Sequence, residues 1–140
     1  MKNHIVNFIT SIKNFIKNKR SSRLVHNKLK MIYLYHNLVR TAPDLKIQPS
    51  ADAYSLKSAD LVFISLYNHK CYSIRLSTSF GINRVTVYVS SVNVTRSGIV
   101  LDYTDTNYVL TVIKNLMYRV DRINFREERN LTWKTSTKNG

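Results

Sequence analysis

The residues of this chain that could carry out chemistry are few, and they lie far apart in the sequence. Asp102 and Asp105, in the stretch LDYTD, come closest to the carboxylate pair with which a nuclease holds Mg²⁺. A nuclease site normally adds a further acid and a lysine, and no such third ligand is recognisable beside this pair. We therefore expect Asp105 to cap or turn the backbone, with a nuclease site as the alternative.

The histidines and the single cysteine add no recognisable site. The four histidines fall in different predicted elements, with His36 expected in the core and His69 in a turn. Cys71 alone can form neither an internal disulfide nor a metal-binding pair. The glycine-rich nucleotide-binding loops GxxxxGK[ST] and GxGxxG are also missing from the sequence. The sequence thus predicts a protein that is not an enzyme and has no cofactor.

Positive charge dominates the chain and suggests its partner. Lysine and arginine number 22 against 8 acids in 140 residues, a formal net charge of +14 that is spread from Lys2 to Lys138. Such an excess repels itself unless a polyanion neutralises it. Nucleic acid and an anionic membrane are the two candidates, and a solvated basic surface is the third possibility. We favour nucleic acid because the charge is scattered over the part expected to fold.

Helical patterns occupy the first third of the chain. The apolar residues of HIVNFITSIKNFIKNKR (residues 4–20) recur with helical spacing, so an amphipathic helix is expected over about residues 3–18. Polar residues interrupt this stretch too often for a transmembrane span. It could instead lie on a membrane surface or act as a mitochondrial presequence. Arg23–His26 could be a helical turn or a short strand, and Asn27 is the expected N-cap of a second helix.

Strand patterns dominate the middle of the chain. Residues 61–76 predict a hairpin with one buried face and a turn at NHK, and residues 84–91 alternate as a third strand with a polar face. A turn at Arg96–Gly98 and a strand in GIVLDY (98–103) are expected next. Residues 107–120 fit a strand, a helix or a switch between them.

These elements predict an α+β fold of two small lobes. The expected lobes are an N-terminal α/β lobe over residues 1–80 and a β-rich, RNA-binding lobe over residues 81–122. Residues 123–140 show little periodicity and are expected to form a basic C-terminal extension that becomes ordered only when a partner holds it.

Four local motifs resemble the eighth small-subunit ribosomal protein, a universal family. NHIVNFITSIKNF resembles the family's opening DPIADxLTRIRNA, and NKLK resembles the SKLK that opens its second helix. LSTSFGINRVTVYV resembles ISKPGLRVYV, and GIVLDYTDTNYVLT resembles the signature GIxIxSTSKGxMT with one residue inserted. The resemblance covers about residues 3 to 120, and Asp105 stands where the family has a hydroxyl.

The resemblance implies a structural constituent of the small ribosomal subunit that binds and organises the central domain of its ribosomal RNA. Neighbouring small-subunit proteins would be further partners, with no small-molecule substrate and no membrane insertion. The divergence suits a mitochondrial ribosome, with a cytoplasmic or plastid ribosome as the alternative. The residues expected to contact RNA are Lys28, Lys30, Ser79, Arg84, Tyr88, Thr104 and Thr106. A basic membrane-surface protein and a viral or phage DNA-binding factor are the alternative functions.

Overall fold

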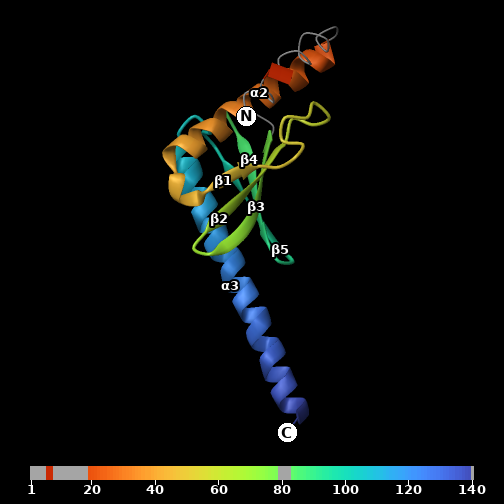
Figure 1. Cartoon of the computed structure of the whole chain (residues 1–140), viewed down its shortest axis with the longest axis vertical. Helices are drawn as coiled ribbons and strands as arrows, with labels where there is room; N and C mark the ends of the chain where they lie inside the picture. Colours follow the sequence, from red (N-terminus) through yellow and green to blue (C-terminus); the bar gives the residue numbers. More distant parts are fainter. Residues whose placement is uncertain (1–5, 8–18, 79–82, 140) are drawn as a thin grey trace.

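Five antiparallel strands form one sheet, and two helices cover one face of it (Figure 1). The computed structural model describes residues 6–7, 19–78 and 83–139, of which residues 19–21 and 130–139 are described by their backbone alone. The strands lie side by side in the order in which they occur along the chain. The expected α+β class is therefore confirmed.

The elements follow one another with short connections. In chain order they are α2 (Lys19–Thr41), the 3-10 helix η1 (Pro43–Leu45), β1 (Ile47–Pro49), β2 (Leu61–Tyr67), β3 (Lys70–Thr78), β4 (Val85–Ser91), β5 (Val94–Val100) and α3 (Thr106–Asn139).

Period-two alternation gives the sheet one buried and one open face. Apolar residues at every second position of β2, β3 and β4 are shielded from water, as expected for a sheet with one covered side. The buried residues of the sheet are Leu61, Phe63, Ser65, Tyr72, Ile74, Leu76, Val85, Val87, Val89, Val94 and Val100. The predicted hairpin of residues 61–76 and the predicted third strand are confirmed as β2–β3 and β4.

Each helix presents an apolar stripe to this face. Residues spaced three or four apart are buried in both helices, which is the spacing that places side chains on one side of a helix. In α2 the buried stripe includes Met31, Leu34, Tyr35 and Leu38, and in α3 it includes Val109, Ile113, Leu116 and Val120. α3 lies over β4 and β5, while α2 contacts α3, β2 and β3.

α3 is longer than the sheet that it covers. Ile123 is a partly buried residue that still packs against the core, and the helix then continues to Asn139 as a rod that extends beyond the strands (Figure 1). Residues 107–120 are thus helical. Residues 123–139, expected to be an extension with little periodicity, are the second half of α3.

Two local predictions are wrong. α2 runs without interruption from Lys19, so Asn27 lies inside the helix and is not its N-cap. Val25, only 3% exposed, contributes to the buried side of this earlier helical segment. The turn expected at Arg96–Gly98 lies instead at Val92–Asn93, and Arg96 is a paired residue of β5 opposite Val89.

The expected two-lobe division is not confirmed. Residue 80 was the expected end of the first lobe, yet β3 and β4 on either side of it pair from Ser73–Ser90 to Thr78–Val85. The described strands therefore belong to one continuous sheet with one core. The predicted first helix over residues 3–18 lies almost wholly outside the described residues. Within the described part, the structure contains no helix with the length and hydropathy needed to cross a bilayer.

Candidate nucleic-acid interface

A groove of about 480 Å³ runs along the side of α2 that faces away from the core. Its walls combine cationic, imidazole and aromatic groups with two aliphatic side chains. The lining residues are His26, Leu29, Lys30, Ile32, Tyr33, His36 and Tyr103. All but Tyr103 come from α2, because positions 26, 29, 30, 33 and 36 recur at helical spacing opposite the buried stripe.

A hydrogen bond to Asn83, two residues before β4, holds Tyr103 beside this helix. The Tyr103 backbone N–H donates to the carbonyl oxygen of Asn83 at 2.9 Å, which links the β5–α3 loop to the residue just before Arg84. Asn83 adopts a left-handed backbone with φ of 63°, a conformation that asparagine tolerates better than most residues. The groove therefore depends on segments far apart in the sequence.

The two carboxylates of the loop stabilise the backbone. Asp102 accepts hydrogen bonds from the backbone N–H of Thr104, at 3.0 Å, and from the Thr104 hydroxyl. Asp105 accepts from the backbone N–H of Tyr108 at 3.2 Å and caps the first turn of α3. The capping role expected for Asp105 is confirmed. No cluster of three or more His, Cys, Asp or Glu side chains suited to a metal ion occurs within the described residues.

The groove offers groups that suit a nucleotide. Tyr33 is 66% exposed and presents an aromatic ring on which a base could stack. Lys30 and the imidazoles of His26 and His36 lie along the same wall, where they could contact phosphate or base edges. His36 is half-buried and lines this groove, whereas we expected it in the core.

Three further predicted contacts lie near this groove. Arg84 is exposed and directly follows Asn83, and Thr104 is exposed and directly follows Tyr103. Thr106, which is half-buried, begins α3 two residues further on. The Tyr103–Asn83 hydrogen bond thus brings the backbone next to Arg84 beside the loop that carries Thr104, and Tyr103 lines the groove together with Lys30.

Lys28 does not belong to this surface. Its side chain is 1% exposed, and its Nζ donates to the backbone carbonyl of Asp60 at 2.5 Å. Burial lowers the pKa of Lys28 to about 8, although the nearby carboxylates of Asp60 and Asp52 partly oppose this shift. A phosphate cannot reach an amine enclosed in this way, so the phosphate contact expected of Lys28 does not fit its position.

The remaining predicted contacts lie elsewhere. Tyr88 is half-buried on the open face of the sheet, where the guanidinium carbon of Arg75 lies 4.2 Å from its ring centroid. Tyr88 alternates with the buried Val87 and Val89, so it lies on the other side of the sheet from α2 and its groove. Ser79 lies outside the described residues.

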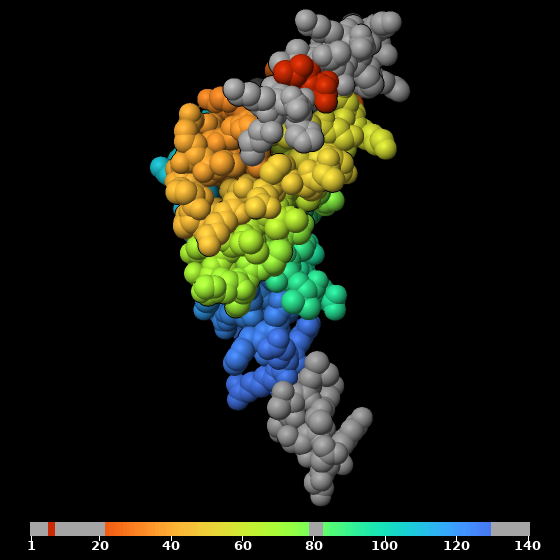
Figure 2. All heavy atoms as spheres, in the orientation of Figure 1, coloured from red at the N-terminus to blue at the C-terminus, as the bar shows by residue number. Residues whose placement is uncertain are grey.

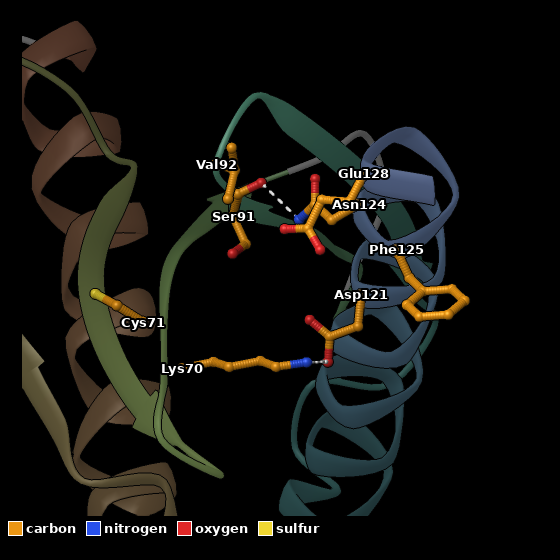
Figure 3. A pocket seen from close by; sticks show the side chains of 8 residues that line it. All are labelled: Lys70, Cys71, Ser91, Val92, Asp121, Asn124, Phe125 and Glu128. Carbon is orange, nitrogen blue, oxygen red and sulfur yellow. Dashed lines mark hydrogen bonds and ion pairs between the residues drawn. The ribbon is translucent and has the colours of Figure 1, made fainter. Parts of the chain in front are cut away.

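A second hollow, of about 500 Å³, lies between the start of β3, the β4–β5 turn and α3 (Figure 3). Asp121 forms an ion pair with Lys70 at 3.4 Å and accepts a hydrogen bond from the Tyr72 hydroxyl at 2.7 Å. Asn124 donates to the Ser91 carbonyl at 3.2 Å. The burial of Tyr72 and its bond to Asp121 raise the pKa of its hydroxyl. These contacts attach α3 to the sheet.

The aromatic residues of the groove were not among the predicted contacts. Tyr33 stands three residues after Lys30 and seven after His26, so helical spacing could have placed all three on one side of α2. Tyr103 had no such signal because its position depends on the hydrogen bond to Asn83.

The comparisons with known proteins identify no relative. No family model, curated protein or solved structure matches this chain. The function proposed for it therefore rests on the geometry of the chain and on the resemblance of its motifs.

Proposed function

We propose that this protein binds RNA without catalysing a reaction, and that its α2 groove receives unpaired nucleotides. The observation that carries this proposal is the exposed ring of Tyr33 beside Lys30, in a groove also lined by Tyr103 and two histidines. Unpaired bases expose their flat faces, and base–aromatic stacking contributes about 1–3 kcal/mol per base. The net charge of +14 favours a polyanionic ligand over a neutral one.

The neighbouring loop adds groups that suit RNA. The Thr104 hydroxyl donates to Asp102, so its oxygen keeps a lone pair that could accept a hydrogen bond from a ribose 2′-OH. Arg84 is exposed nearby and could pair with a phosphate. Because the loop carboxylates are engaged with the backbone, the proposal gives them no catalytic role.

Small-subunit ribosomal RNA is the RNA that we propose, since the motif resemblance implies this partner. In this role the protein neutralises converging phosphates and stabilises the folded RNA within the subunit, beside other small-subunit proteins. The proposed location is a mitochondrial ribosome, with a cytoplasmic or plastid ribosome as the alternative. The proposal assigns the contacts to the helical side of one continuous sheet and does not require two lobes.

Fluorescence anisotropy with a short single-stranded RNA tests the groove. We expect Tyr33→Ala to weaken binding by about fivefold or more, the loss of one stacked base. Tyr88→Ala is the matched control, since it removes a tyrosine from the open face of the sheet, and we expect it to leave the affinity within about twofold. Failure of the intact protein to bind RNA, or equal losses in the two variants, would contradict the proposed groove.

Sedimentation of the native protein from cell extract tests the proposed partner. A ribosomal protein travels with the small subunit, and crosslinking followed by sequencing should then recover central-domain ribosomal RNA. Recovery of scattered DNA would favour a DNA-binding factor, and flotation of the full chain with anionic vesicles would favour a membrane-surface protein. Either result without ribosomal RNA would overturn the assignment of the partner.

A further inference from the structure

Four arginines form a stripe on the side of α3 that faces away from the core. Arg119, Arg122, Arg126 and Arg129 are all exposed, and their spacing of three, four and three residues places them on one side of the helix. In the part of the chain that the structure describes, none of the four forms an ion pair. We call these residues the arginine stripe. It is about 15 Å long because a helix rises about 1.5 Å per residue.

Aromatic side chains flank the arginine stripe. Tyr118 is 62% exposed and Phe125 is 64% exposed, so both rings are open to a ligand that lies along the stripe. The guanidinium carbon of Arg122 lies 5.7 Å from the ring centroid of Tyr118. This cation–π contact favours an arginine that lies along the helix surface with its donors still available.

The nearby acids lie on another side of α3. Asp121 is held by Lys70 and Tyr72, and Asp121 and Glu128 both line the hollow beside β3 (Figure 3). Glu127, the third acid here, stands four residues after Ile123, which packs against the core, so helical spacing places it on that side as well. The three carboxylates therefore lie outside the arginine stripe. The helix thus has a basic outer side, and carboxylates on the side toward the sheet.

Part of the arginine stripe lies on the rod that extends past the sheet. Arg126 and Arg129 follow Ile123, which still packs against the core (Figures 1 and 2). An isolated helical segment gains little stability without tertiary packing or a partner. No described element covers this side of α3, so a ligand that runs along it would meet a basic surface.

We propose that the arginine stripe binds the phosphate backbone of double-stranded RNA. This inference rests on the proposed RNA-binding function and adds a second surface for the same ligand. Arginine pairs with phosphate through two parallel N–H donors, so a row of arginines could hold successive phosphates. A helix seated deep in a groove would meet phosphates on both flanks, whereas the arginines of the stripe lie on one side of this helix. The one-sided charge instead suits a helix that lies across the backbone of an RNA helix, whose major groove is too narrow to admit it.

The α2 groove and the arginine stripe would then divide one RNA between them. Both surfaces lie on the helical side of the sheet, the groove beside the start of α3 and the stripe further along the same helix. Unpaired nucleotides would occupy the groove and an adjoining duplex would lie along α3. A hairpin with a single-stranded overhang is therefore the best probe, and the stem alone and the overhang alone are its two parts.

The test measures the affinity of the full chain for these three RNAs at several salt concentrations. The stripe variant combines Arg122→Gln, Arg126→Gln and Arg129→Gln. The control variant combines Lys46→Gln, Lys57→Gln and Arg75→Gln, three exposed cations elsewhere on the protein, so both lose the same charge. Glutamine is close to arginine in helix propensity, and circular dichroism checks that α3 remains folded.

We expect the stripe variant to bind the stem about tenfold more weakly, with a log–log salt slope that is smaller by about two to three. Its affinity for the overhang alone should stay within about twofold. Equal losses in the stripe and control variants would overturn the inference, as would stripe-dependent binding of duplex DNA or anionic vesicles without that of duplex RNA. If binding of the overhang depends on Tyr33 but binding of the stem does not depend on the arginine stripe, the proposed function stands and this inference fails. If neither RNA binds, both fail.

Discussion

A lysine on the side of α2 that faces the core differs from a lysine on the side that faces solvent. Lys28 and Lys30 stand two residues apart on α2, and both were expected to contact phosphate. Lys28 is enclosed and donates to the Asp60 carbonyl, whereas Lys30 lines an open groove beside Tyr33. Two residues correspond to about 200° of rotation around a helix, which is enough to separate a structural lysine from one available to a ligand.

α3 shows the same division. Its inner side carries apolar residues and Asp121, which contacts both Lys70 and Tyr72. Its outer side carries the arginine stripe, which forms no ion pair within the described residues. The number of basic residues thus indicates a polyanionic partner. Which of these residues are exposed and unpaired indicates where that partner binds.

Removing an inner apolar side chain should have the largest effect on stability. Ile113 is fully buried between α3 and the sheet. We expect Ile113→Ala to lower the free energy of unfolding by about 2–5 kcal/mol, because it removes buried surface and leaves a cavity. Asn115→Ala, an exposed control on the same helix, should change it by less than about 0.5 kcal/mol. Urea denaturation measures both, and similar losses would contradict the assignment of the two sides.

Lys28, on the side of α2 that faces the core, should make the free energy of unfolding depend on pH. The unfolded chain holds the Lys28 proton up to its ordinary pKa of 10.5, and the folded chain releases it at about 8. The unfolded state binds more protons between these values, so stability should rise with pH across this window, by about 2 kcal/mol after allowance for solvent screening. Lys28→Met should abolish this rise in urea titrations at pH 7.5, 8.5 and 9.5.

Buried tyrosines limit this rise at higher pH. Burial raises the pKa of Tyr35 to about 12 from its ordinary 10.0, so above pH 10 the folded state binds more protons and its stability should fall. Lys28→Met should keep this fall. A rise between pH 8 and 10 that persists in Lys28→Met would show that another group causes it.

The contact between α3 and β3 should have a moderate effect. Tyr72→Phe removes the hydroxyl that donates to Asp121, and we expect a loss of about 1–2 kcal/mol in unfolding free energy. Tyr88→Phe makes the same chemical change on the open face and should cost less than about 0.5 kcal/mol. Thermal unfolding compares the two, and an equal cost would argue that the Tyr72–Asp121 bond contributes little.

A single arginine of the stripe should have the smallest effect on stability. We expect Arg126→Ala to leave the free energy of unfolding within about 0.5 kcal/mol, because the side chain is exposed. The same variant should reduce the salt slope of duplex RNA binding by about one. A clear loss of stability with an unchanged slope would place Arg126 among the structural residues.

Local patterns predicted much of the sheet. Alternation of apolar and polar residues located β2, β3 and β4, and the loop chemistry of Asp105 predicted its capping role. The residues of α3 were ambiguous because Val109, Ile113 and Val120 suit a strand as well as a helix. Their burial at spacings of three and four decides for the helix once the sheet that they cover is known.

Other features needed the tertiary structure. Asn27 looked like a helix start because capping residues are a local signal, yet burial of Val25 extends the helix beyond it. The enclosure of Lys28 could have been predicted, since it precedes Met31 by three residues and Tyr35 by seven and so shares their side of α2. The position of Tyr103 could not, because it depends on a contact with a residue twenty positions away.

Ultraviolet crosslinking of the full chain to RNA, with the crosslinked peptides identified by mass spectrometry, tests the central claim most directly. We predict crosslinks to Tyr33 and Tyr103 in the α2 groove and to Tyr118 or Phe125 beside the arginine stripe. Tyr88 on the open face of the sheet should remain free of crosslinks. Crosslinks at Tyr88 with none on α2 or α3 would contradict the account, because RNA would then bind the side of the sheet that the helices leave open.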